Sequence, residues 1–445
     1  MPAPKSVAAE LLRQIAAAQI EQRAPSIAAA VVRDGEVIWA DAVGLANAES
    51  GETATPDHQY RIGSITKSFT AAAIMQLHEA GKLALDDRLD AHLPGVEHGS
   101  LPIRRLLAHA SGLQREIPGD VWETLVFPDG AELVGLMGEA EQVLGPGERY
   151  HYSNLAFSLL GEAISRLSGL AYEAYVAERI IGPLGLKRTT FERTEPAATP
   201  YFVDPYADVV HPEPLIEKSG SVAAAGSLWS TAADLTGWAA FLADPNEDVL
   251  SKASIDAMSS VQVMVDNDRW DFGYGLGLQL SRAGDRVLVG HSGGMPGFLS
   301  NVSVSRKEKI GAVVLASSSS NIDPQSIASK LALTVIEQFP LAPEPWRPGV
   351  AAPPELAGVL GRWWSEGEEF VFRFHDGRLE ARWTQAPAWV AWSRFEPLGD
   401  DRFRTTQGRE RGELLRIVRD GDGAPARLYW ATYPMTRSPE TFFPS

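Results

Sequence analysis

Cysteine is absent from the 445-residue sequence. Disulfide bonds, thiolate nucleophiles and cysteine-based metal sites are therefore excluded. The nine histidines show no H-E-x-x-H pattern or comparable ligand spacing, so no metal site is indicated. We expect a protein that works without a metal or any other cofactor.

Long apolar runs and an excess of positive charge are also missing. No stretch reaches the roughly 18 apolar residues needed to span a bilayer, and the N-terminus has the pattern of an amphipathic helix rather than a signal peptide. Forty basic against 57 acidic residues give a net charge of −17. This charge argues against nucleic acids and anionic membranes as partners. We expect a cytoplasmic protein, and no pattern indicates its oligomeric state.

The composition, 44% hydrophobic and 22% charged, is typical of a soluble globular protein, and the length predicts two or three domains. Two β-rich runs, 27–33 and 36–44, are separated by an Asp-Gly hairpin signal. Residues 82–270 are mainly helical, and four short strand patterns follow. We expect an α/β (α+β) domain over residues 1–342, in which an antiparallel sheet flanked by helices carries an all-helical insertion at 82–270.

The C-terminal part has a different composition. Five prolines between positions 341 and 354 predict a linker at 343–354. Residues 355–445 alternate as in a small all-β barrel or sandwich. Seven of the twelve tryptophans lie between 346 and 430. They either fill the core of this barrel or mark a ligand surface, and core packing is the simpler interpretation.

The stretch around Ser64 carries the strongest chemical signal. Strong helix formers follow Ser64, so we expect it to open a helix, where unpaired N–H groups and the dipole favour a developing negative charge. Lys67 lies three residues later on the same face, which gives Ser-x-x-Lys, a nucleophile with an adjacent amine. A plainer interpretation makes Ser64 a helix cap and Lys67 a solvated lysine. A cation in the first turn opposes the helix dipole, however.

A second motif, Tyr152-x-Asn154, lies where another helix is predicted to begin. A lysine near Tyr152 would lower its pKa by favouring the phenolate. Tyr152 is therefore a candidate general base toward Ser64 and a candidate proton donor to the leaving group. Asn154 would use its amide to hold Lys67 or the substrate. The plainer interpretation is a packed turn tyrosine followed by an asparagine helix cap.

A third motif, Gly290-His291-Ser292-Gly293-Gly294, ends a predicted strand, where glycines permit close approach of a ligand carbonyl. The same run matches G-x-S-x-G, which makes Ser292 a rival nucleophile. That motif requires a strand, a sharp turn and a helix. A further strand pattern follows here instead, so we prefer Ser64 as the nucleophile.

The ordered triple of Ser64-x-x-Lys67, Tyr152-x-Asn154 and His291-x-Gly293 resembles the three motifs of the serine β-lactamase and penicillin-binding-protein superfamily. The tyrosine motif is most similar to class C β-lactamases, D-specific aminopeptidases, D,D-carboxypeptidases and their esterase relatives. The resemblance covers roughly residues 10–340, and the tail beyond 355 resembles the lipocalin-like barrels attached to some of these hydrolases.

The resemblance implies a role for each motif residue. Ser64 would be acylated, Lys67 would lower the proton affinity of Ser64, and Tyr152 would shuttle the proton. Asn154 would position that proton transfer. The backbone N–H groups of Ser64 and Gly294 would form the oxyanion hole, often worth about 3–4 kcal/mol per donor. The implied binding site for the substrate further includes Ser292 and Gly293 of the third motif.

One departure from the family pattern affects the expected substrate. The third motif of true β-lactamases begins with a lysine that binds a carboxylate, whereas His291 stands here and is only partly charged near neutral pH. We therefore expect inefficient β-lactam hydrolysis and a serine hydrolase acting on an ester or amide of a small molecule or short peptide, D-amino-acid peptides included. The alternatives are a peptide cyclase that passes the acyl group to an amine, and a penicillin-binding sensor that acylates once.

Overall fold

The computed structural model describes residues 2–216, 218–341 and 345–439. The chain divides into two compact units, residues 1–341 and 342–445, and each is described by itself. Residues 343 and 344 of the predicted linker lie outside the described residues. Within the described ranges, no helix combines the length and the apolar character needed to cross a membrane.

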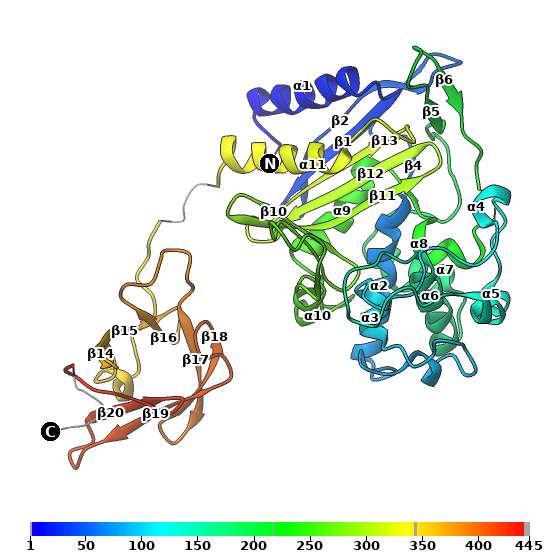
Figure 1. The fold of residues 1–445 in the computed structure, drawn as a ribbon. Coiled ribbons are helices and arrows are strands. Elements are labelled where there is room, and N and C mark those ends of the chain that lie inside the picture. The colour runs from blue at the N-terminus through cyan, green and yellow to red at the C-terminus, as the bar shows by residue number, and fades with distance from the viewer. Residues whose placement is uncertain (1, 217, 342–344, 440–445) are drawn as a thin grey trace. The chain divides into compact units, whose positions relative to one another are not determined.

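The first unit is built on a nine-stranded antiparallel sheet, with the strand order β3-β2-β1-β13-β12-β11-β10-β9-β8 (Figure 1). Strands from the two ends of the unit meet where β1 pairs with β13, with Ala30 opposite Val313. The strands of this sheet are β1 (Ser26–Arg33), β2 (Glu36–Asn47), β3 (Glu52–Thr53), β8 (Val263–Met264), β9 (Phe272–Tyr274), β10 (Gln279–Ala283), β11 (Arg286–Met295), β12 (Phe298–Ser305) and β13 (Ile310–Ala316). The predicted antiparallel sheet is confirmed.

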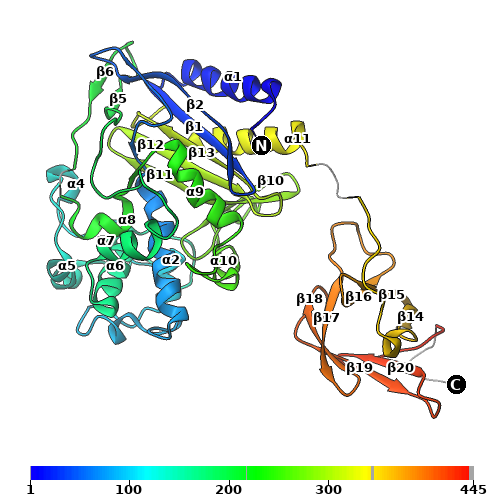
Figure 2. The ribbon, with the colours of Figure 1, turned by 180° about the vertical axis from the view of Figure 1, so that it is seen from behind.

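Helices cover both faces of the sheet, as Figures 1 and 2 show. Every residue of β1 is buried because alternate side chains enter two separate cores. Ile27 and Val31 pack with α1 (Lys5–Glu21) and α11 (Pro324–Gln338). Ala28 and Val32 belong to the core that includes α9 (Ala232–Ala243). The sheet is therefore the middle layer of three.

The remaining helices lie between the two halves of the sheet in sequence. They are α2 (Thr66–Glu79), α3 (Ile103–Leu107), α4 (Val121–Thr124), α5 (Gly130–Leu136), α6 (Asn154–Ser168), α7 (Tyr172–Val176), α8 (Ala223–Gly226) and α10 (Lys252–Met258). The insertion also contains the hairpin of β5 (Tyr201–Val203) and β6 (Val210–Pro212), and β7 (Trp229–Ser230) pairs with β4 (Tyr60–Arg61). The expectation of an all-helical insertion is therefore wrong, because β5 finds an antiparallel partner within its own proline-containing loop.

The sequence pattern also predicts one strand where the structure has two, β9 and β10. A single strand was expected over 273–280, but the chain turns between β9 and β10. Gly277 has a φ of +70° there, and a Cβ atom at Gly275 would lie 2.0 Å from the carbonyl oxygen of Met258. Both positions therefore require glycine, and these glycines mark the turn.

Helix α2 runs through the centre of the first unit, and almost all of its side chains are buried. The rings of Phe69 and Trp238 stack with their centroids 3.8 Å apart. The indole nitrogen of Trp238 donates to the Ser68 hydroxyl at 2.9 Å. These contacts fix α2 against α9, and α9 packs on the sheet. The start of α2 is therefore held at a defined position beside the sheet.

The second unit is a small barrel of eight antiparallel strands in sequential order, as predicted. They are β14 (Gly361–Ser365), β15 (Glu368–His375), β16 (Arg378–Trp383), β17 (Ser393–Gly399), β18 (Arg402–Gln407), β19 (Leu414–Arg419), β20 (Pro425–Trp430) and β21 (Tyr433–Met435). Backbone hydrogen bonds between Trp364 and Thr436 bring the first and last strands together. Trp363 and Trp430 fill the core, whereas Trp389 is 84% exposed. Core packing is therefore confirmed for Trp363 and Trp430, whereas a ligand surface at Trp389 stays a prediction.

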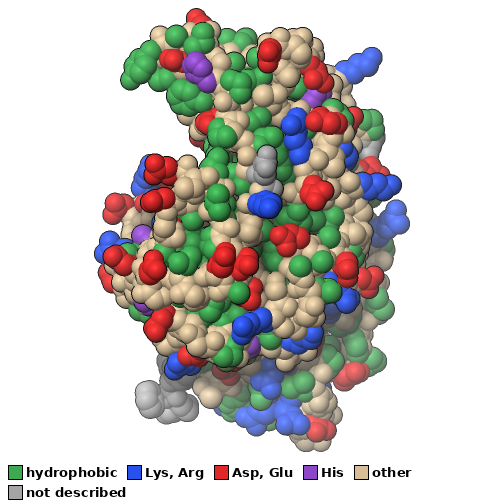
Figure 3. Space-filling model, turned by 90° about the vertical axis from the view of Figure 1, so that its right-hand side faces the viewer, with side chains coloured by type: hydrophobic (Ala, Val, Ile, Leu, Met, Phe, Trp, Pro, Cys, Tyr) green, Lys and Arg blue, Asp and Glu red, His purple; other side chains and the backbone are tan. Residues whose placement is uncertain are grey.

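The surface carries charges of both signs. Figure 3 shows acidic and basic side chains interspersed with apolar ones over one face of the molecule. The acidic excess of the sequence is spread over this face rather than gathered in one place.

Candidate active site

The Ser64 hydroxyl and the Lys67 amine meet beside the sheet. Ser64 lies in a short 3₁₀ turn, Gly63–Ile65, and α2 begins at Thr66, so Ser64 precedes the α-helix instead of opening it. The Lys67 Nζ lies 3.0 Å from the Ser64 Oγ and donates to the carbonyl oxygen of Ala225 at 2.6 Å. The solvated lysine of the plainer interpretation is excluded, because the Lys67 side chain is fully buried.

Burial controls the charge of this lysine. It lowers the pKa of Lys67 well below the usual value, and the nearby Arg115 lowers it further, whereas Glu116 raises it. No ion pair joins Lys67 to a carboxylate in the part of the chain that the structure describes. The environment therefore favours the neutral amine, which can accept a proton from Ser64.

Tyr152 reaches the same hydroxyl from the loop before α6. Its phenol interacts with the Ser64 side chain, and its ring lies 4.9 Å from the Lys67 Nζ. Burial raises the pKa of Tyr152, and this effect outweighs the interaction with Ser64, which lowers it. The predicted shift toward phenolate is therefore wrong in direction. A neutral amine can accept a proton, and a protonated phenol can donate one.

Asn154 has a different partner from the predicted one. Its Nδ2 donates to both carboxylate oxygens of Glu116, at 2.8 and 3.0 Å, and not to Lys67 or Tyr152. The helix cap is Ser153, whose hydroxyl accepts from the backbone N–H of Ala156. The expected direct role of Asn154 is therefore replaced by an indirect one, in which its amide fixes the carboxylate of Glu116.

The imidazole of His291 is buried and uncharged. Its Nδ1 donates to the carbonyl oxygen of Ser292 at 2.5 Å, so its Nε2 accepts from the Tyr274 hydroxyl at 2.8 Å. Burial lowers the pKa of His291 to about 3. The partial positive charge expected from the sequence is therefore absent near neutral pH. His291 does not form a cationic carboxylate site.

Strand β11 passes against the Ser64 turn at two glycines. A Cβ atom on Gly293 would lie 1.9 Å from the carbonyl oxygen of Ile62, and one on Gly63 would lie 2.6 Å from the backbone nitrogen of Gly294. Side chains at these positions would push the strand away from the turn. The missing side chains therefore bring the backbone nitrogen of Gly294, one of the two predicted oxyanion donors, next to the turn that carries the other.

The Ser292 hydroxyl is directed elsewhere. It donates to Gln325 of α11 at 3.2 Å and accepts from Asn301 at 3.0 Å. Neighbouring residues of a strand face opposite sides, so this hydroxyl lies on the side that α11 covers. No helix follows β11, as the nucleophile interpretation of Ser292 requires. The structure therefore does not bring the Ser292 hydroxyl to Ser64, either as a nucleophile or as a substrate contact.

Two aromatic neighbours of the site were not identified from the sequence. His109 has a φ of +53° and is fully buried, and its ring centroid lies 4.1 Å from that of Tyr152 and 4.7 Å from that of Tyr274. Its Nδ1 accepts from the backbone N–H of Ser153. Burial lowers the pKa of His109 well below its usual value, so the ring packs as a neutral one. The sequence signal at this position is the run 106–113, a helix pattern that ends at a glycine.

The site contains no carboxylate or imidazole cluster of the kind that holds a metal. A search of the described ranges finds no group of three or more such side chains arranged around a possible ion. The functional groups that converge on the Ser64 Oγ are an amine and a phenol. An amine and a phenol at a serine hydroxyl are suited to nucleophilic and acid–base chemistry.

Comparison with known proteins places this geometry in a family. The sequence matches the family model described as Beta-lactamase over residues 9–335, and a domain of unknown function, DUF7586, over residues 352–437. Esterase EstB of Burkholderia gladioli is 33% identical over 233 residues, which cover 48% of this chain and 58% of the esterase. The chain spans about 60% of the length of the curated relatives that it matches first.

Two solved structures share the fold. The octameric penicillin-binding protein homologue from Pyrococcus abyssi has a TM-score of 0.65 and 26% identity, covering 96% of this chain and 99% of its own. A D-stereospecific amidohydrolase from Streptomyces sp. has a TM-score of 0.63 and 27% identity, covering 75% and 99%. With the family match extending over most of the sequence, the chain belongs to the beta-lactamase family.

Proposed function

We propose that the chain is a serine hydrolase that cleaves an ester or amide bond through an acyl-enzyme on Ser64. The observation that carries this proposal is the convergence of two groups on one hydroxyl. The Lys67 Nζ lies 3.0 Å from the Ser64 Oγ, and the Tyr152 phenol interacts with the same side chain. Similarity to an esterase and to an amidohydrolase supports both bond types.

Acylation follows from the charges of these groups. The neutral Lys67 amine takes the proton of Ser64 while the Oγ forms a bond to the substrate carbonyl carbon. The backbone N–H groups of Ser64 and Gly294 stabilise the resulting oxyanion. When the carbon–leaving-group bond breaks, the leaving group takes the phenolic proton of Tyr152. The proton held by Lys67 then passes to Tyr152, so the amine is again neutral and the phenol again protonated.

Deacylation uses the same groups with water in place of the leaving group. Lys67 accepts a proton as the water oxygen attacks the ester carbonyl, and Ser64 takes a proton from Tyr152 as it departs. The proton on Lys67 again returns to Tyr152. The products are a carboxylic acid and the free enzyme, and no cofactor enters the balance.

The charges around the site indicate the substrate class. His291 is neutral and hydrogen-bonded to Tyr274, so it offers no cation to the carboxylate of a β-lactam. The carboxylate of Glu116 is held by Asn154, by the Trp122 indole at 2.8 Å and by an ion pair with the exposed Arg115 at 3.3 Å, and it is the anionic group that acts on Lys67. Such a carboxylate complements an ammonium group on the acyl part of the substrate. We therefore favour small amino-acid esters and amides or short peptides.

A substrate panel tests the proposal. Chromogenic esters, D- and L-amino-acid anilides and a cephalosporin are compared by kcat/KM. Ser64→Ala should lower turnover of the best substrate by about 10³-fold or more, because covalent catalysis is lost. The matched control Ser292→Ala should stay within about threefold, since its hydroxyl lies on the other side of the sheet. Loss of activity in Ser292→Ala with retention in Ser64→Ala would overturn the assignment.

A second comparison tests the preference for an ammonium group. Glu116→Gln should lower kcat/KM for an aminoacyl anilide about two- to fivefold, the loss expected for a partly exposed charge pair. The same variant should leave the N-acetylated anilide nearly unchanged, because that substrate has no ammonium group. Equal losses on both substrates would show that Glu116 does not recognise the substrate charge.

A further inference from the structure

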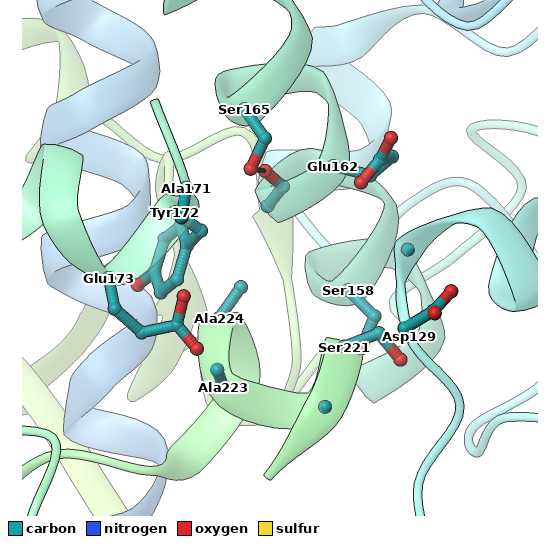
Figure 4. A pocket seen from close by; sticks show the side chains of 13 residues that line it. Asp129, Ser158, Glu162, Ser165, Ala171, Tyr172, Glu173, Ser221, Ala223 and Ala224 are labelled. Carbon is teal, nitrogen blue, oxygen red and sulfur yellow. Dashed lines mark hydrogen bonds between the residues drawn. The ribbon is translucent and has the colours of Figure 1, made fainter. Parts of the chain in front are cut away.

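A second pocket lies in the helical region, apart from the Ser64 site. It has a volume of about 230 Å³ and is formed by α6, the first turns of α5 and α7, and the segment around α8 (Figure 4). None of the side chains that contact Ser64 or Lys67 lines it. The pocket is thus independent of the reaction proposed above.

The charges of the pocket lining all have one sign. Three carboxylates line it, those of Asp129, Glu162 and Glu173, and no lysine, arginine or histidine does. Figure 4 shows Glu173 at one end, with Asp129 and Glu162 on the opposite side. Arg166 approaches Glu162 at 3.6 Å, but no ion pair is made by Glu173 in the described ranges. The lining therefore has acidic side chains at both ends, of which Glu162 is partly offset by Arg166 and Asp129 caps α5, whereas Glu173 has no ion-pair partner in the described ranges.

Two hydroxyl groups in the lining have no partner. The Oγ atoms of Ser158 and Ser221 are buried and make no hydrogen bond within the described structure. Ser158 is only 1% exposed and lies on the face of α6 that forms the pocket wall. Buried polar groups are normally paired, because an unpaired one loses its hydration without compensation. These serines retain the capacity to accept hydrogen bonds from a molecule in the pocket.

The stretch between the two charged ends is apolar. The ring of Tyr172 and the methyl groups of Ala171, Ala223 and Ala224 line it. The Tyr172 hydroxyl is already bonded to Thr70 at 2.8 Å, so the ring edge rather than a free hydroxyl borders the pocket. A short methylene chain matches this stretch, because it loses no hydrogen bonds on burial.

We propose that this pocket binds a small linear diamine, with one ammonium group at Glu173 and the other between Asp129 and Glu162. The serine hydroxyls accept hydrogen bonds from the ammonium protons, and the methylene groups lie along the alanines and Tyr172. A single ammonium group would leave one end uncompensated. A bare metal ion is disfavoured, because the described residues hold no group of three ligands arranged around an ion.

Calorimetric titration of the full chain with 1,4-diaminobutane at low ionic strength tests the proposal. We expect saturable binding of one diamine per chain. Butylamine and 1,4-butanediol should bind at least about tenfold more weakly, because each lacks one or both charges. The affinity should fall as salt is added. Absence of saturable binding at millimolar diamine, or equal affinity for butylamine, would overturn the proposal.

Variants locate the binding. Glu173→Gln should weaken it about tenfold, and Ser158→Ala should weaken it severalfold. The control Glu178→Gln removes an exposed carboxylate that does not line the pocket and should change the affinity less than twofold. Ser64→Ala should bind the diamine like the natural chain, so this test is separate from the proposed hydrolysis. Equal effects of Glu173→Gln and Glu178→Gln would show that the diamine binds elsewhere.

Discussion

Replacement of Lys67 by methionine separates catalysis from stability. The Lys67 side chain is fully buried, and burial lowers its pKa well below the usual value. Methionine has a similar length and fills the same space without a charge or an amine. If Lys67 is the base toward Ser64, the Lys67→Met variant keeps its fold and loses its chemistry. If the lysine only supports the fold, the variant should lose stability, and its activity should fall because less of the protein is folded.

The structure sets the size of both effects. Loss of a positioned general base costs about 10²–10⁴-fold in rate, or about 3–5 kcal/mol in the activation barrier. On the stability side, the carbonyl oxygen of Ala225 loses the donor that lies 2.6 Å away. Such a loss costs about 1–3 kcal/mol, and relief from burying an amine offsets part of it. We therefore expect the free energy of unfolding to change by less than about 2 kcal/mol.

The assay measures the rate of acylation by a p-nitrophenyl ester in stopped flow, together with thermal unfolding. Lys82→Met is the matched control, because that lysine is exposed and its Nζ only donates to the carbonyl oxygen of Leu167 at 3.3 Å. Its acylation rate should equal that of the natural chain. An acylation rate in Lys67→Met within tenfold of the natural chain would refute the assignment of Lys67 as the base.

Three further predictions follow from the same contacts. The acylation rate should rise with pH through the pKa of Lys67, which burial places well below 10.5, because only the neutral amine accepts a proton. The rate should fall only in strong alkali, because burial raises the pKa of Tyr152. Asn154→Asp sets a carboxylate against Glu116, so kcat/KM should fall about tenfold. Phe69→Ala removes a stacked core ring and should cost about 3–5 kcal/mol in denaturant unfolding.

Each of these predictions has an outcome that contradicts it. An acylation rate that rises only near pH 10.5 would mean that Lys67 is charged at neutral pH. If Asn154→Asp has the kcat/KM of the natural chain while Asn301→Asp loses activity, the hydrogen bond from Asn154 to the Glu116 carboxylate does not contribute to catalysis. An unfolding free energy of Phe69→Ala within 1 kcal/mol of the natural value would mean that α2 is not held by its core.

The fold was largely readable because its signals are local. Period-two runs with turn signals gave the strands in the middle of the sheet, β1, β2 and β11 to β13, and prolines marked the change to the second unit. The hairpin of β5 and β6 was missed because three-residue strands carry too little alternation to be recognised. The turn at Gly275–Leu278 was missed because Gly275 closely approaches Met258 and Gly277 closely approaches Ala71, and both partners are distant in sequence from these glycines.

The positions of the site residues were easier to predict than their charges and partners. Motif order located Ser64, Lys67, Tyr152 and His291, and the structure brings them together. The protonation states depend on burial, which no short motif encodes, so the direction of the Tyr152 shift was predicted wrongly. The partner of Asn154 lies 38 positions away, so their hydrogen bond has no signature in the sequence.

The central claim is that one hydroxyl is the nucleophile, and peptide mapping of a covalently labelled sample tests it most directly. The natural chain is incubated with a fluorophosphonate probe, digested with trypsin and analysed by mass spectrometry. The account predicts one adduct per chain, on Ser64 within the tryptic peptide Ile62–Lys67, and none in Ser64→Ala. An adduct confined to the peptide that contains Ser292, or an unchanged adduct in Ser64→Ala, would contradict it.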